Sequence, residues 1–271
     1  MIEGRAGKVA IYVAATLAAL AWLLPYAWMV STSFKTLGEI LARPADPLPA
    51  HPSVEGYREV FRAISVGRYA LVTGAMATSI AALQVVLALP AGYALAKLRF
   101  VGRPFAAAAV LACLFVPAQA SFVPVFLLFA RLHWVDTMGA LVLPFAASAL
   151  GTLLVRQALQ SVPDELVEAA RMDGASEWTI IYRILAPTLT PTLISLFLVS
   201  FVFHYNDYFW PLVMTTDDSV RTLPLAIALL REQGTGVRWH IVMAGNVVLS
   251  LPILMLFAVL QRHLVRAVGL R

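Results

Sequence analysis

Residues 167–187 read VEAARMDGASEWTIIYRILAP, and this stretch decides the fold of the 271-residue chain. It holds a Glu-Ala-Ala triplet at 168–170, a glycine at Gly174 and an Ile-Leu-Ala-Pro close at 184–187. Charged residues crowd here, whereas the chain on either side is almost entirely apolar. A polar loop of this length between two membrane-spanning helices indicates that it docks onto a partner.

The composition is that of a membrane protein. Hydrophobic residues make up 61% of the chain and charged residues 13%, with a net charge of +5 and a mean hydropathy of +0.82. A soluble protein carries about a quarter charged residues. The single cysteine, Cys113, excludes an intrachain disulfide and is expected to be a small buried hydrophobic residue.

Six apolar segments are each long enough to cross a bilayer as a helix, which takes about 20 residues. The expected fold class is therefore all-α: one polytopic membrane domain over 1–271, with six transmembrane helices and a cytoplasmic coupling helix. The first segment is too long for a signal-peptide core, so we expect a retained anchor. The expected spans are 9–30, 69–95, 104–129, 138–155, 188–213 and 240–260.

The positions of Lys and Arg predict the orientation. Lys97, Arg99 and Arg103 fall in one short loop without an acidic residue. We therefore expect both termini, this loop and the loop 156–187 on the cytoplasmic side. The loops 31–68 and 215–239 are then external, and the first combines a proline-rich part with a run of helical period at 54–64.

The loop 156–187 contains the signals for a short helix over about 162–173. Ser161 is its expected N-cap, with Pro163 in the first turn and Asp164 near the positive end of the helix dipole. Gly174 is the expected left-handed residue that ends the helix.

The same loop contains the signal for a second helix. Ser176 is expected to cap it. In the first helix, Ala169 and Ala170 allow another backbone or ring to approach closely, and Glu168 and Arg171 are expected to share a face. The alternative is an amphipathic helix lying on lipid headgroups, which favours Lys and Arg over acidic residues.

With these residues in place, the loop resembles the EAA loop of ABC-importer permeases, whose pattern is E-A-A, three residues, G, nine residues and I-x-L-P. The matching residues are Glu168, Ala169, Ala170, Gly174, Ile184 and Pro187, with Ala186 where the family prefers Leu. Further matches resemble the second permease of the maltose-type carbohydrate importers, and they lie at 33–36, 206–212, 221–224 and 261–263. The resemblance covers nearly the whole chain.

The resemblance implies an importer half-channel in a bacterial or archaeal cytoplasmic (inner) membrane. A second permease subunit pairs with it, two ATPase subunits dock on the cytoplasmic side, and an extracytoplasmic solute-binding protein delivers the solute. The lipid bilayer surrounds it, and no nucleic acid is an expected partner. The implied ATPase-coupling residues are Glu168, Ala169, Ala170, Arg171, Asp173 and Gly174.

Sequence motifs for catalysis are missing. The chain has no G-x-x-x-x-G-K-[ST], no H-E-x-x-H and no Cys/His cluster with metal-ligand spacing. We therefore expect no catalytic or metal-binding residue and no bound cofactor. The resemblance implies that ATP and Mg are used by the partner ATPase, so this chain is not itself an enzyme.

An ion-coupled secondary transporter is the alternative function. Such proteins keep ionisable residues inside their spans, and away from the span ends only His204 and Asp207 qualify. A non-transporting assembly subunit would not need the docking helix.

Polar residues near the outer part of the fifth span are candidates for the solute path: Tyr205, Asn206, Asp207 and Tyr208. Gln84, Gln119 and Asn246, in other spans, are further candidates. For all of these residues the alternative is hydrogen bonding that holds the helices together. Trp210 and Trp239 are expected in the outer aromatic belt, with sugar binding as the alternative. The flexible residues Gly234, Thr235 and Gly236 are expected to approach the binding protein.

Overall fold

The computed structural model describes residues 5–232 and 237–267, and these are helices and connecting loops with no strand among them. The chain divides into two compact units. The first combines Met1–Gly67 with Ala226–Pro252, and the second combines Arg68–Leu225 with Ile253–Arg271. The predicted loop tip at Gly234, Thr235 and Gly236 lies outside the described residues.

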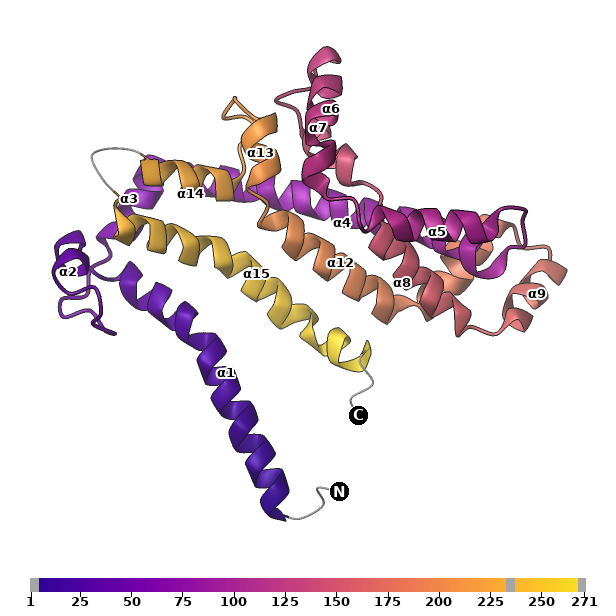
Figure 1. The fold of residues 1–271 in the computed structure, drawn as a ribbon, viewed down its shortest axis with the longest axis horizontal. Coiled ribbons are helices and arrows are strands. Elements are labelled where there is room, and N and C mark those ends of the chain that lie inside the picture. The colour runs from indigo at the N-terminus through magenta and orange to yellow at the C-terminus, as the bar shows by residue number, and fades with distance from the viewer. Residues whose placement is uncertain (1–4, 233–236, 268–271) are drawn as a thin grey trace. The chain divides into compact units, whose positions relative to one another are not determined.

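The first unit contains three helices from the N-terminal part of the chain and parts of two later ones (Figure 1). These are α1 (Arg5–Ser33), α2 (Leu37–Ala42), α3 (Glu55–Ala63), most of α14 (Leu223–Glu232) and the first half of α15 (Trp239–Ala267). The helix predicted at 54–64 is confirmed as α3. It packs closely on α15, since a Cβ at Gly56 would lie 2.7 Å from the carbonyl oxygen of His240.

The proline-rich loop between α2 and α3 is tied back to the end of α1. The hydroxyl of Ser31 donates to the carbonyl of Pro47, and the Lys35 ammonium donates to the carbonyl of Asp46. Lys35 is 2% exposed, and its Nζ lies 5.4 Å from the centre of the Trp28 ring. Prolines cannot donate backbone hydrogen bonds, so side chains of the preceding segment hold this loop.

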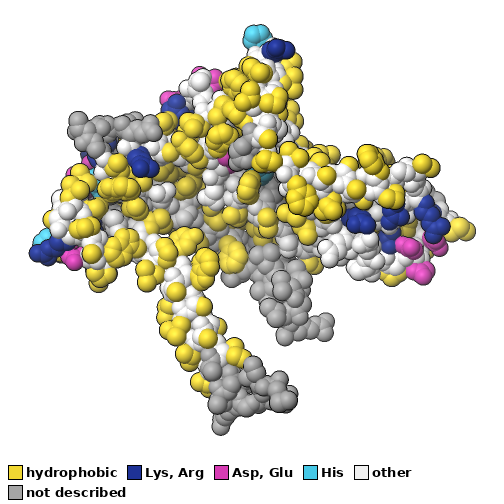
Figure 2. Space-filling view, viewed as in Figure 1, with side chains coloured by type: hydrophobic (Ala, Val, Ile, Leu, Met, Phe, Trp, Pro, Cys, Tyr) yellow, Lys and Arg dark blue, Asp and Glu magenta, His cyan; other side chains and the backbone are white. Residues whose placement is uncertain are grey.

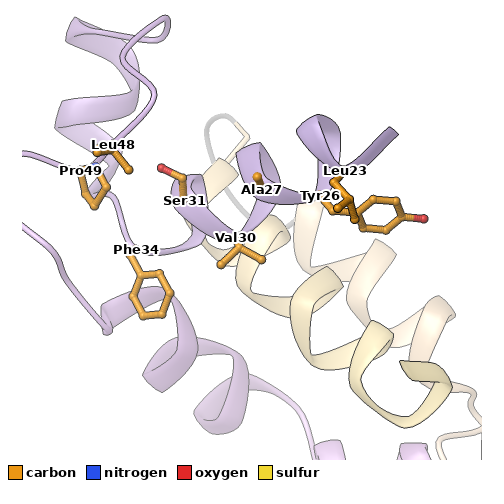
Figure 3. A pocket seen from close by; sticks show the side chains of 8 residues that line it. All are labelled: Leu23, Tyr26, Ala27, Val30, Ser31, Phe34, Leu48 and Pro49. Atoms are coloured by element: carbon orange, nitrogen blue, oxygen red, sulfur yellow. The ribbon is translucent and has the colours of Figure 1, made fainter. Parts of the chain in front are cut away.

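A groove of about 580 Å³ lies between the end of α1 and this loop (Figure 3). Its lining residues are Leu23, Tyr26, Ala27, Val30, Ser31, Phe34, Leu48 and Pro49. Most of these side chains are apolar, and the Ser31 hydroxyl is already bonded to Pro47. The groove offers too few hydrogen-bonding groups to hold a sugar, which needs several convergent polar partners.

The second unit contains the remaining helices. They are α4 (Val66–Lys97), α5 (Arg103–Cys113), α6 (Ala118–Arg131), α7 (Met138–Val142), the 3₁₀ helix η1 (Leu143–Phe145), α8 (Ala149–Gln160), α9 (Asp164–Met172), α10 (Glu177–Thr179), the π-helix η2 (Ile180–Leu185), α11 (Ala186–Thr188), α12 (Thr190–Tyr205) and α13 (Phe209–Met214). Within this unit α9 lies beyond the end of α8, well away from α6, α7 and α13 (Figure 1).

Several helices are long and apolar enough to cross a membrane. Among the described residues, Ile11–Ser33, Val66–Lys97 and Trp239–Val259 satisfy the length and hydropathy of a span. Two bent pairs add up to two more: Met138–Phe145 with Ala149–Gln160, bent by 44°, and Glu177–Thr188 with Thr190–Tyr205, bent by 86°. The all-α membrane class is confirmed, while the number of six spans stays a prediction.

The third predicted span, 104–129, is not one helix. It forms the shorter apolar helices α5 and α6, with a break between them that ends at Pro117. Proline disfavours the helical conformation of the residue before it and supplies no N–H. The apolar pattern runs through this break, so composition alone did not reveal it.

Two side chains differ from expectation. Cys113 is exposed rather than buried. Trp210 is buried, not part of an aromatic belt, and its Nε1 donates to the carbonyl of Ala140 at 2.9 Å. Hydrophobic side chains cover much of the visible surface (Figure 2), which is the surface expected of helices that face lipid or another membrane subunit.

α4 approaches α8 closely at Gly92. A Cβ placed there would lie 2.7 Å from Cγ1 of Val155 and 2.9 Å from the backbone nitrogen of Arg156. Val155 is fully buried in a core that also contains Tyr93 and Val167. A residue without a side chain therefore lets the two helices meet next to the start of α9.

We predict that Gly92→Ala destabilises the protein by about 1–3 kcal/mol, because the added methyl overpacks the α4–α8 contact. Gly74 is the matched control in the same helix, since a Cβ there meets nothing within 4 Å. Gly74→Ala should be neutral or slightly stabilising. Thermal unfolding of the purified protein in detergent measures both, and equal midpoints for the two variants would contradict the packing argument.

Candidate functional site

The start of α9 differs from the predicted cap. The hydroxyl of Ser161 donates to the carbonyl of Ala158 at 2.7 Å, and Pro163 occupies the N-cap position without a side-chain bond. The prediction that Ser161 caps this helix is therefore wrong. Pro163 keeps Val162 out of the helical region, so Ser161 finishes α8 and α9 begins only at Asp164.

A lysine from α4 binds the start of α9. Lys97 Nζ lies 2.5 Å from Oδ1 of Asp164 and also donates to the carbonyl of Val162. The hydrogen bond and the charge of Lys97 lower the pKa of Asp164. Because the Lys97 side chain is 6% exposed, this pair fixes the first turn of α9 to the last turn of α4.

The end of α9 agrees with the prediction. Gly174 has φ +78°, and its N–H donates to the carbonyl of Arg171 at 3.0 Å. The N–H of Ala175 donates to the carbonyl of Ala170, also at 3.0 Å. This is the pattern of a glycine-terminated helix. Ser176 Oγ then accepts a backbone N–H from the first turn of α10, as predicted.

Three side chains brace α9 against α4 and α10. Arg171 donates from Nε to Oε1 of Glu177 at 2.8 Å and from Nη2 to the hydroxyl of Tyr93 at 3.0 Å. The Tyr93 hydroxyl donates to Oε2 of Glu177 at 2.5 Å. The hydrogen bond to Glu177 raises the pKa of Arg171. Arg171 therefore pairs inside the permease with Glu177 and not with Glu168.

The outward face of α9 is exposed. Val167 and Ala170 are buried against the core, whereas Glu168 and Ala169 are exposed and Met172 is 88% exposed. Within the described part of the chain the side chain of Glu168 forms no hydrogen bond or ion pair. Charged side chains gather at this end of the second unit (Figure 2). Asp173 and Gly174 are also exposed, at the turn that follows.

The four candidates for the solute path form the break between α12 and α13, and they separate into two pairs. Tyr205 is 1% exposed, and the Asp207 carboxylate accepts the backbone N–H of Trp210 at 3.3 Å. Asn206 is exposed and Tyr208 is 39% exposed. The second pair is therefore the more exposed, since Tyr205 is buried and Asp207 is half-buried.

The ionisable candidate His204 lies inside the helix packing. It is 4% exposed and its ring centre lies 4.9 Å from that of Phe145. Nε2 of Gln84 lies 3.4 Å from Nε2 of His204 and donates to the carbonyl of Phe145 at 2.8 Å. These contacts join three helical segments, as the helix-holding alternative for Gln84 requires.

An aspartate that the sequence reasoning missed organises the other end of this unit. Asp136, at φ +62°, follows α6. Its carboxylate accepts the hydroxyl of Thr216 at 2.6 Å and the backbone N–H of Asp217 at 2.8 Å. Burial opposes its ionisation, but these hydrogen bonds outweigh burial and lower its pKa. The available signal was one acidic residue in a short loop between apolar segments.

Comparison with known proteins identifies the family of this chain. Residues 84–270 match the family of binding-protein-dependent transport system inner membrane components. The chain belongs to this family. It is thus a multi-pass permease subunit of a binding-protein-dependent transport system, and the relatives below are transport permeases rather than enzymes.

Two relatives show the range of similarity. The arabinooligosaccharides transport system permease protein AraQ of Halalkalibacterium halodurans is 34% identical over 174 residues, covering 64% of this chain and 62% of that protein. The sn-glycerol-3-phosphate transport system permease protein UgpE of Brucella abortus is 28% identical over 255 residues, covering 91% of this chain and 90% of that protein.

A solved structure shows the same fold. It is the crystal structure of a bacterial ABC transporter involved in the import of the acidic polysaccharide alginate. The TM-score is 0.80 at 21% identity, covering 97% of this chain and 99% of the matched chain. The permease resemblance drawn from the sequence is confirmed, and the family membership leaves no support for an ion-coupled secondary transporter.

We predict that Asp136→Asn loosens the Thr216–Asp217 segment at neutral pH by on the order of 1 kcal/mol, because hydrogen bonds to a partly exposed carboxylate are weakened. The folded pKa of Asp136 is lowered, so its contribution is complete above the unfolded value of about 3.9 and is lost as pH falls through the folded pKa.

Thermal midpoints of wild type and Asp136→Asn across pH test this. The difference should be constant above about pH 4 and close in more acidic solution. Asp173→Asn, at an exposed position after α9, is the control and should show no such difference. A wild-type advantage that persists unchanged into strong acid would refute the role of the ionised carboxylate.

Proposed function

We propose that this chain is one of two permease subunits of an ATP-driven importer for a sugar or sugar-like solute. The observation that carries the proposal is the arrangement of α9. The side chains on its outward face are exposed, whereas Asp164 and Arg171 bond to residues of α4 and α10. Two ATPase subunits dock on the cytoplasmic side of the permease pair and use ATP and Mg; one of them binds this outward face, while this chain binds no cofactor. Both termini lie in the cytoplasm.

The chemistry of α9 supports a protein partner rather than lipid headgroups. The exposed residues Glu165 and Glu168 are acidic, and anionic headgroups would repel them. Met172 offers a flexible apolar side chain beside the small Ala169, which permits close approach. Met and a few charges around an apolar centre are typical of a docking surface.

The relatives support a polyhydroxylated solute, since one is named for arabinooligosaccharides and another for sn-glycerol-3-phosphate. Asn206 and Tyr208 carry the hydrogen-bonding groups at the surface break between α12 and α13, and we propose that they line the solute path. An extracytoplasmic binding protein delivers the solute, with Gly234, Thr235 and Gly236 approaching it from the outer loop.

We predict that Glu168→Lys and Gly174→Val each abolish solute uptake and release the ATPase subunits. The first reverses a charge at the docking face. The second forces a β-branched residue to φ +78°, which is strongly disfavoured. Purification of each variant complex, followed by quantification of retained ATPase and of solute-stimulated ATP hydrolysis, measures the effect.

Gly102→Val is the matched control, since Gly102 also has a positive φ of +89° but lies before α5. It carries the same backbone strain and should keep its ATPase subunits. If both α9 variants retain wild-type ATPase content and stimulation, α9 is not the coupling element and the proposed function fails.

A further inference from the structure

A second groove, of about 480 Å³, lies between α5 and α8. Its walls combine small and aliphatic side chains with a polar rim. The lining residues are Ala107, Ala108, Leu111, Leu153, Arg156, Gln157 and Gln160. None of them belongs to the docking face of α9 or to the break between α12 and α13. The groove is therefore separate from both parts of the proposed transport machinery.

Two guanidinium groups converge beside this groove on the last turn of α4. Arg103 donates from Nε to the carbonyl of Leu95 and from Nη2 to that of Ala96, both at 3.0 Å. Arg156 donates from Nε to the same Leu95 carbonyl at 3.4 Å. Helix C-terminal carbonyls attract cations, which explains why both side chains are drawn to this point.

The positive charge at this point is not neutralised within the described residues. Neither Arg103 nor Arg156 forms an ion pair there, and Asp164, the first residue of α9, is bound by Lys97. In the same part of the chain the two Nη atoms of Arg156 have no hydrogen-bond partner, although this side chain lines the groove. The groove thus combines apolar walls with an arginine side chain, Arg156, that has no acidic partner within the described residues.

We propose that the groove binds an anionic phospholipid. The planar guanidinium of Arg156 matches the phosphate of the headgroup, to which arginine donates paired hydrogen bonds. The amides of Gln157 and Gln160 serve the glycerol and ester oxygens. An acyl chain lies against Ala107, Ala108 and Leu111. Basic pockets between membrane helices on the cytoplasmic side bind acidic lipid headgroups in this way.

The location gives the bound lipid a structural role. The Leu95 carbonyl that Arg103 and Arg156 share lies three residues beyond Gly92, where α4 meets α8. A lipid phosphate on Arg156 therefore bridges α4, α5 and α8 next to the Lys97 contact that starts α9. The assignment of this lipid to the cytoplasmic leaflet rests on the proposed orientation of the chain, whereas lipid binding itself depends only on the groove.

Native mass spectrometry of the complete purified transporter tests the proposal. The complex is incubated with vesicles of phosphatidylcholine and phosphatidylglycerol in equal parts, then released and weighed with its retained lipids. Wild type should retain phosphatidylglycerol in preference to phosphatidylcholine. Arg156→Gln should reduce this retention about tenfold, the ratio expected for losing a charge-assisted hydrogen bond.

Two further variants test whether lipid retention depends on the groove itself or only on the positive charge of this region. Arg99→Gln removes an exposed positive charge nearby that does not line the groove, and it should retain the lipid. Leu111→Trp fills the groove while keeping every charge, and it should lose the lipid.

Equal retention of both lipids by wild type, or unchanged retention by Arg156→Gln, would overturn the proposal. So would loss of the second permease from Arg156→Gln without any change in bound lipid, since the groove would then be a subunit interface. Because none of these readouts depends on ATPase docking, they fail or succeed independently of the proposed function.

Discussion

The position of α9 depends on the hydrogen-bonded group of Tyr93, Arg171 and Glu177. A nine-residue helix such as α9 is not stable alone in water, because nucleation costs more than so few hydrogen bonds return. α9 also buries only Val167 and Ala170. Its position must therefore come from polar bonds to the rest of the permease, and this group supplies them at one end.

The Lys97–Asp164 pair supplies them at the other end. α9 is held at both ends to the last turns of α4, and in the proposed function it therefore follows any movement of that span and transmits force in return. The residues of the EAA segment therefore fall into two groups, one bonded to the permease and one exposed. Arg171 bonds to the permease core and Gly174 shapes the turn, whereas Glu168, Ala169 and Met172 are exposed and are the residues that we propose contact a partner.

Local signals in the sequence predicted local structure well. The left-handed Gly174, the Ser176 cap and the helix at 54–64 each depend on residues within a few positions of one another. The cap at Ser161 failed because a proline two residues later competed with it. The break before Pro117 was hidden by an uninterrupted apolar composition.

Contacts between distant parts of the chain could not be predicted from the sequence. Tyr93 lies 78 residues from Arg171, and Asp136 lies 80 residues from Thr216. No periodicity or motif indicates that such residues meet, since only the helix packing brings them together. The same holds for Trp210, whose burial depends on the Ala140 carbonyl that it reaches. The sequence thus indicated which loop matters, and the structure shows how it is held.

The most direct test of the central claim is a cysteine crosslink from the outward face of α9. Met172→Cys, made in a Cys113→Ser background, is treated in the assembled transporter with a short thiol-to-amine crosslinker. We expect a crosslink to an ATPase subunit from position 172 and none from Val101→Cys, a fully exposed position in the loop before α5. Equal crosslinking at both positions, or none at 172, would contradict the account.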